Sequence, residues 1–195
     1  NHIKMAEQKN QNEHLNVEDA LTQSEAFLVK YKNAIIGGVV AVIIIVAGFI
    51  MYKNLYAEPR EEKAQAALFK GQEYFEQDAF EQALNGDSIG YAGFLKVADD
   101  YSGTKAANLA KAYAGICYAQ LGKYEDAVKM LDSFDGSDQM VAPAILGAAG
   151  NCYAQLGQLD KAASTLLSAA DKADNNTLSP IFLIQAGEIL VKQGK

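Results

Sequence analysis

Cys117 and Cys152 carry the most reactive side chains in this sequence, because a thiol can bind a metal, form a disulfide or act as a nucleophile. The two residues stand 35 positions apart, and neither belongs to a CxxC pair. The histidines, His2 and His14, lie far from both, near the start of the chain. Metal and redox sites need clustered ligands, so no such site is expected here. Both cysteines fall inside apolar helical patterns, which predicts two buried thiols. If the domain lies outside the cytoplasm, a disulfide bond between Cys117 and Cys152 is an alternative that the sequence leaves undecided.

The remaining polar residues form no recognisable catalytic set. The sequence contains no Ser-His-Asp or Cys-His arrangement, no metal-ligand spacing and no glycine-rich phosphate loop. The acidic pairs Glu61-Glu62 and Asp99-Asp100 are interpreted as solvated helix faces. The protein is therefore expected not to be an enzyme, and to use no metal, cofactor or small-molecule substrate.

Charge is distributed unevenly along the chain. The 195 residues include 17 Lys and Arg against 24 Asp and Glu, a formal net charge of −7. Up to Ala57 there are five Lys and five acidic residues, so the whole net charge belongs to residues 58–195. An acidic domain repels phosphate backbones, which argues against nucleic acid as its ligand. The expected partner is another protein.

A membrane-spanning helix is predicted from Ala34 to Tyr52. These 19 residues carry no charge, and at 1.5 Å per residue they extend about 28 Å, close to the thickness of a bilayer hydrocarbon core. Lysines and tyrosines flank both ends, as at membrane interfaces. A long polar leader before the apolar run favours an uncleaved signal anchor over a cleaved signal peptide. The pairs Ala34/Gly38 and Gly37/Ala41 are small residues four apart, a spacing that lets another transmembrane helix approach.

The chain before the span, residues 1–33, is interpreted as a polar leader followed by a short amphipathic helix. Residues 1–4 precede Met5 and are expected not to be native. Basic residues on the two sides of the span do not decide the orientation. The preferred topology keeps the leader inside and the long domain outside.

Residues 63–195, reached through a linker and helix start at 53–62, contain a repeat. Four segments align without gaps from Gly71, Gly115, Gly150 and Gly187, at intervals of 44, 35 and 37 residues. Each glycine falls in the middle of a predicted helix, where it costs about 1 kcal/mol relative to alanine, so close helix packing is the expected compensation. Seven residues later come Asp78, Gly122, Gly157 and Gly194, predicted to end each first helix in the left-handed conformation. The second helices are predicted to begin at Phe80, Tyr124 and Leu159.

This pattern resembles the tetratricopeptide signature. The resemblance implies an all-α fold: an N-terminal transmembrane helix followed by an α-α superhelix of about three and a half helix pairs. The copies lie near 63–103, 104–142, 143–179 and, incomplete, 180–195. The long first interval implies an insertion of about ten residues relative to the usual 34-residue unit, with a turn at residues 85–88 and a second helix from Tyr91 to Tyr101. The last copy lacks its second helix, so the natural chain is expected to continue past Lys195 or to be covered by a partner.

In such repeats the first helices line a concave groove that holds peptides or partner helices. The apolar residues at these groove positions are equally consistent with ordinary core packing. The positions also lack the Lys and Arg residues with which some members of the family bind the terminal carboxylate of a peptide. Mapped onto this chain they are Leu68, Gln72, Phe75, Leu109, Ala112, Ile116, Gln120, Ala144, Gly147, Asn151, Gln155, Ile184 and Glu188.

The layout of leader, span and small acidic repeat domain resembles the bacterial YfgM-type family, ancillary subunits of the Sec translocon that work with periplasmic chaperones. The resemblance implies a single-pass protein of the bacterial inner membrane with a cytoplasmic N-terminus and a periplasmic repeat domain. Its implied partners are translocon subunits, periplasmic chaperones or emerging chains. Two alternatives stay open: a scaffold of another envelope assembly or secretion machine, and a cytosol-facing receptor with inverted topology.

Overall fold

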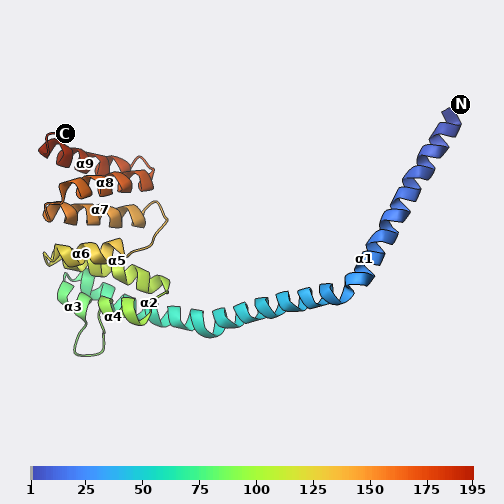
Figure 1. Cartoon of the computed structure of the whole chain (residues 1–195). Coiled ribbons are helices and arrows are strands. Elements are labelled where there is room, and N and C mark those ends of the chain that lie inside the picture. The colour runs from blue at the N-terminus through green and yellow to red at the C-terminus, as the bar shows by residue number, and fades with distance from the viewer. Residues whose placement is uncertain (1) are drawn as a thin grey trace. The chain divides into compact units, whose positions relative to one another are not determined.

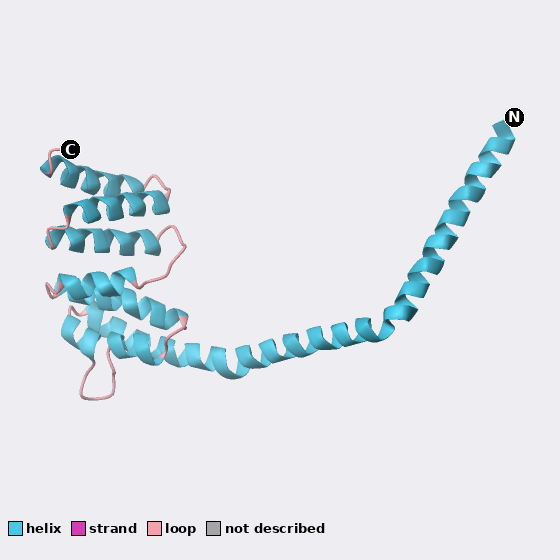
Figure 2. Cartoon of the chain, in the orientation of Figure 1, coloured by secondary structure: helices cyan, strands magenta, loops and turns pink. Residues whose placement is uncertain are grey.

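The computed structural model describes the backbone of residues 2–195 and the side chains of Thr22 and of residues 25–195. Within this described part helices are joined by loops and turns and there is no strand, which confirms the all-α class (Figure 2). The chain divides into two compact units, Asn1–Leu55 and Tyr56–Lys195. The two units are described separately below.

The first unit consists of one long helix, α1 (His2–Tyr52), with the beginning of a short π-helical segment, η1 (Lys53–Ala57). The predicted amphipathic helix and the predicted span are therefore parts of the same element. The side chains of the polar leader lie outside the described residues, apart from Thr22. From Glu25 onward this helix is long and apolar enough to cross a membrane, and no side chain of its most apolar window is buried.

The second unit is built from helices joined by short turns (Figure 1). Its first part contains α2 (Glu58–Glu76), α3 (Phe80–Asn85) and α4 (Phe94–Asp100). The middle part contains α5 (Lys105–Gln120) and α6 (Tyr124–Asp132). The last part contains α7 (Val141–Gln155), α8 (Leu159–Ala173) and α9 (Ser179–Lys192). The second helices begin at Phe80, Tyr124 and Leu159, as predicted.

The helices stack in chain order, and each second helix packs on its own first helix and on the first helix that follows (Figures 1 and 2). Thus α6 lies against α5 and α7, and α8 lies against α7 and α9. In the first pair α3 and α4 share this role, because both contact α2 and α5. Each helix buries the apolar face of its neighbour, so two adjoining clusters of buried residues fill the stack.

Three of the four repeated glycines lie at helix-to-helix contacts, as predicted. A Cβ added at Gly71 would come within 2.4 Å of the Phe94 ring, and one added at Gly115 would come within 2.5 Å of Leu131. At Gly150 the nearest atom is 2.8 Å away, on Leu166. Gly187 differs, because nothing lies within 4 Å of its Cβ position and no helix follows α9. The fourth glycine was therefore wrongly predicted to lie at a contact within this chain.

Gly147, placed among the groove residues, is also at a contact: its Cβ would lie 2.3 Å from Cε1 of Phe182. Gly147→Ala is expected to lower the free energy of unfolding by about 1–2 kcal/mol, because overpacking costs more than the gained helix propensity. Gly187→Ala, the matched control, is expected to raise it by about 0.5–1 kcal/mol, because the added methyl meets no neighbour. Urea unfolding of the full chain in detergent micelles, followed by circular dichroism, measures both. Two stabilising substitutions would contradict the contact at Gly147.

The first helix of each predicted copy ends at a residue with a positive φ angle. Gly122, Gly157 and Gly194 have φ angles of 73°, 71° and 72°, in the left-handed region that glycine tolerates without a steric penalty. Asp78 takes the same position in the first copy at φ 54°. The predicted left-handed helix ends are therefore confirmed in all four copies.

The second helix of the first pair departs from the prediction. A helix follows the turn, as predicted, but α4 runs from Phe94 to Asp100 and the expected start at Tyr91 was wrong. The backbone amide of Tyr91 donates to the side chain of Asp87, and Gly93 follows with φ 94°. A Cβ at Gly93 would also lie 2.5 Å from the backbone of Asn85, so this position requires glycine. Helix α4 therefore begins only after Gly93, at Phe94. The two short helices α3 and α4 are joined by a protruding loop (Figure 1).

Candidate protein-binding surface

The predicted groove positions divide into three classes by solvent exposure. The first class is buried, so a partner cannot contact it. Leu68, Ala112 and Gly147 are buried within the helical domain. Leu68 belongs to the core cluster shared by α2, α3, α4 and α5, and Ala112 belongs to the cluster of the later helices. The structure corrects the prediction here, because these three residues pack against the chain itself.

A second class is half-buried, and its members contact neighbouring helices. Nε2 of Gln72 donates a 3.0 Å hydrogen bond to the hydroxyl of Tyr113 across the α2–α5 contact. The ring of Phe75 meets Tyr113 edge-on at 5.1 Å and Phe80 at 5.5 Å. Leu109 and Ile116 are partly buried against the same core clusters. These side chains pack between adjacent helices, and each is only partly accessible to solvent.

The third class is exposed and forms the accessible part of the predicted groove. It comes from the ends of α5 and α7 and from the outer face of α9. Amide side chains dominate it, and Glu188 is its charged member. The residues are Gln120, Ala144, Asn151, Gln155, Ile184 and Glu188.

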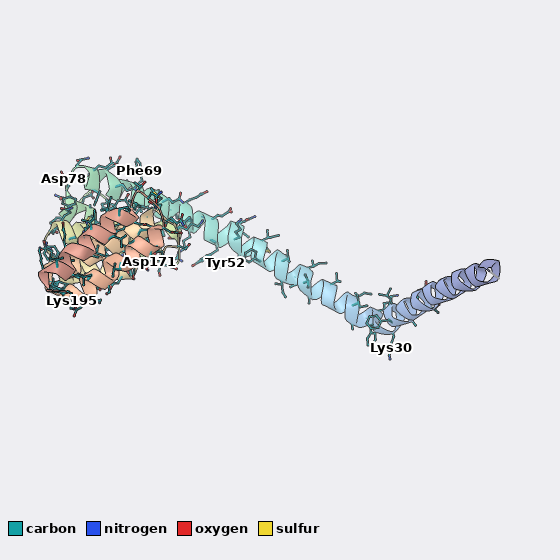
Figure 3. The ribbon with its side chains drawn as sticks, turned by 90° about the horizontal axis from the view of Figure 1, so that it is seen from above. Lys30, Tyr52, Phe69, Asp78, Asp171 and Lys195 are labelled. Carbon is teal, nitrogen blue, oxygen red and sulfur yellow. The ribbon has the colours of Figure 1, made fainter. Side chains whose placement is uncertain are left out.

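The four transmembrane contact residues lie on α1. Ala34, Gly37, Gly38 and Ala41 are all exposed, and nothing in the described chain lies within 4 Å of a Cβ at Gly37 or Gly38. Lys30 and Tyr52 mark the two ends of this apolar part of α1 in Figure 3. Among the described residues, no side chain of the most apolar window of this helix is buried.

A polar contact between repeats involves residues that the sequence did not single out together. The hydroxyl of Tyr153 on α7 donates to the carboxylate of Asp132 on α6, and Nζ of Lys161 on α8 lies 4.0 Å from the Tyr153 ring centroid. Burial, reinforced by the Asp132 hydrogen bond, raises the pKa of Tyr153 above its usual value. A phenol held in its neutral form keeps the hydrogen that it donates, so Tyr153 links α7 to α6.

The two cysteines are buried and unbonded, as the apolar pattern predicted. Burial raises the pKa of the Cys117 thiol to about 12, and it raises the pKa of Cys152 as well. Because the thiolate is the nucleophile and the metal ligand, both groups are held in the unreactive form. Among the described residues no three His, Cys, Asp or Glu side chains cluster in a way that could hold a metal ion.

The loop between α3 and α4 is organised by a single carboxylate, Asp87. Its Oδ1 accepts hydrogen bonds from the backbone amides of Ile89 and Tyr91, at 2.9 and 2.8 Å. Its Oδ2 accepts a 2.6 Å bond from the hydroxyl of Tyr74 on α2. These bonds, the Tyr74 hydroxyl first, lower the pKa of Asp87 to about 2. The sequence showed a turn here, and the Asn-Gly-Asp-Ser run was its signal, but the side chain that orders the loop was not foreseen.

No protein-family model matches this sequence, and a search of curated protein sequences finds no match either. Function must therefore be inferred from the residues themselves.

Proposed function

We propose that this chain is a membrane-anchored protein-interaction module, in which α1 crosses a bilayer once and the following helices form a tetratricopeptide-like stack that binds other proteins. The observation that carries the proposal is the charge-free segment Ala34–Tyr52 of α1. Its large apolar side chains are all exposed, from Ile35 to Tyr52. A run of this length whose described side chains are exposed needs an apolar environment to bury it, and a bilayer provides one.

The residues at the ends of this segment support the same reading. Tyr31 and Tyr52 stand at its two ends, where aromatic side chains favour the headgroup level. Lys30 and Lys32 precede it and Lys53 follows it, so positive side chains can reach the interface from either end. A helix with apolar residues on all sides and charges only at its limits suits a span better than a surface helix.

The tetratricopeptide-like part of the proposal is supported by the repeated glycine contacts at Gly71, Gly115 and Gly150 and by the four left-handed helix ends. A solenoid of this kind offers its ligands one extended face. The amides Gln120, Asn151 and Gln155 are among the predicted groove positions, and all three are exposed. Amide side chains both donate and accept hydrogen bonds, so they suit the backbone of a polypeptide ligand.

The proposed place of action follows the family resemblance. The leader faces the cytoplasm, the helical domain stands in the periplasm, and the partners are translocon subunits, periplasmic chaperones or emerging chains. The formal charge of −7, all carried by residues 58–195, fits a domain that avoids anionic surfaces and nucleic acid.

Orientation is tested with the single exposed cysteine of an Asp171→Cys variant. Asp171 is exposed on α8 (Figure 3), whereas both native thiols are buried. In intact cells whose outer membrane has been made permeable, a membrane-impermeant maleimide is expected to label the variant and to leave the native protein unlabelled. Labelling only after the inner membrane is opened would assign the domain to the cytoplasm and reject the periplasmic proposal.

Partner binding is tested with a photo-crosslinking amino acid at Gln155, and with the same residue at Lys129 on α6 as the control. Crosslinks to translocon subunits, chaperones or emerging chains from position 155 alone would support the proposal. A probe at Gly38 in the span separates a translocon neighbour from a scaffold. Recovery of a different envelope assembly from mild detergent, with no crosslink to translocon or chaperone, would replace the proposed role by the scaffold.

A further inference from the structure

A cavity of about 300 Å³ lies on the outside of the first helix pair. Helix α2 contributes one side, and α4 with its C-terminal residues contributes another. The third side is the loop before α4. Most of the lining is apolar, and the charged side chains are Lys70 and Asp100. The lining residues are Ala66, Ala67, Lys70, Gly90, Tyr91, Ala92, Val97, Asp100 and Tyr101.

Two large exposed apolar side chains are sequence neighbours of the residues that line this cavity. Phe69 is 60% exposed and lies next to Lys70 on α2, one turn from Ala66 (Figure 3). Ile89 is 85% exposed, the highest value among the large apolar side chains described, and it precedes the lining residue Gly90. We call the cavity together with Phe69 and Ile89 the Ile89 patch.

The loop that carries Ile89 is ordered before any partner arrives. Asp87 fixes the amides of Ile89 and Tyr91 and is itself fixed by Tyr74. The ring of Tyr91 is buried, and its hydroxyl donates to the carbonyl of Ala83 at 2.8 Å. An apolar side chain held out by a fixed backbone loses little conformational entropy on binding, which is the property of a binding anchor.

Lys70 and Asp100 are the charged side chains of the Ile89 patch. Lys70 forms no ion pair with any residue in the described part of the chain, although Asp100 lines the same cavity. The Asp100 carboxylate accepts a 3.1 Å bond from Lys96, and both groups are exposed. The patch thus presents one free cation and one accessible anion within a domain whose formal charge is −7. Two copies of so acidic a domain repel each other on average, whereas an unpaired lysine can attract a carboxylate of the second copy.

We propose that the Ile89 patch pairs with the same patch of a second copy around a two-fold axis. Ile89 of each copy enters the cavity of the other, and Lys70 of each copy meets Asp100 of the other. In a two-fold contact the same surface of each copy must fit itself. Here Ile89 is the protrusion and the cavity is the hollow that would receive it. Copies that share one membrane orientation can meet in this way around an axis normal to the bilayer, a step that rests on the proposed anchor.

The test measures the monomer–dimer equilibrium of the full chain in detergent micelles by sedimentation velocity. Wild type is expected to dimerise, and Ile89→Asp to weaken dimerisation by about thirtyfold or more, as loss of a buried anchor does. Lys70→Asp and Asp100→Lys are each expected to weaken it about tenfold, because each brings like charges together. The double variant restores the opposite pair, so its dimerisation constant is expected to return to within about threefold of wild type.

Two comparators complete the design. Val191→Asp alters the exposed apolar face of α9, and Gly38→Leu alters the small residues of the span; neither is expected to change the equilibrium. A monomeric wild type, a dimer that survives Ile89→Asp, or a charge-reversed double variant without recovery would overturn the proposal. Failure of the membrane anchor alone would appear in cell fractionation, and the dimer in micelles would remain.

Discussion

Aspartates in place of Val42 and Ile45 are expected to release the chain from the membrane. Both residues lie in the middle of the charge-free segment of α1 and are exposed along the helix. A charged side chain at the centre of a transmembrane helix costs about 3 kcal/mol on an insertion scale, so two cost about 6 kcal/mol. Because each 1.4 kcal/mol is a factor of ten, insertion is expected to fall by roughly four orders of magnitude.

The measurement is the fraction of protein that stays with membranes after washing at alkaline pH. Wild type is expected in the pellet and the double variant in the supernatant. Met140→Asp provides the control, because Met140 is exposed on the loop before α7 and its replacement adds the same charge outside the span. If the double variant remained in the pellet, α1 would not be the anchor, and the proposed function would lose its foundation.

Phe94→Ala is expected to lower the free energy of unfolding of the helical domain by about 3–5 kcal/mol, the range for removing a buried aromatic ring. The ring is completely buried. It stacks on Tyr113 of α5 at 5.1 Å and meets Tyr91 edge-on at 6.2 Å. On its remaining side it touches the backbone of Gly71 on α2, which has no side chain that could fill the space. The cavity left by the substitution joins three helices, so little collapse is expected.

Val191→Ala is the control, since Val191 is an apolar residue on α9 that stays mostly in solvent and lies outside the Ile89 patch. Its replacement is expected to change the free energy of unfolding by less than about 0.5 kcal/mol. Urea titration of the full chain in detergent micelles, followed at 222 nm, gives both values. Equal losses from the two substitutions would show that Phe94 does not hold α2, α4 and α5 together.

The repeat itself was readable from the sequence because its signals are local and recur. A glycine that ends a helix acts through its own φ angle, so Gly122, Gly157 and Gly194 needed no knowledge of distant neighbours. The same holds for the starts of α3, α6 and α8. The charge-free run from Ala34 was equally plain, since composition alone sets whether a helix is long and apolar enough to span.

Which of the predicted groove residues are exposed could not be predicted from local sequence patterns. Leu68 and Ala112 carry the same pattern as exposed groove residues, and only the helix lying opposite each of them decides that they are buried. Gly187 shares the pattern of Gly71, Gly115 and Gly150, yet its contact is absent because no helix follows it here.

The loop between α3 and α4 is the clearest case in which distant residues decide the local structure. Local pattern favoured a helix from Tyr91, but Asp87 binds the backbone of that segment and Tyr74 on α2 holds Asp87 in place. Tyr74 is thirteen residues from Asp87, so its influence cannot be seen in any short window of sequence. Periodicity and helix-end chemistry act within a few residues and can be read along the chain, whereas burial and loop shape depend on which distant side chains meet, and folding alone brings those together.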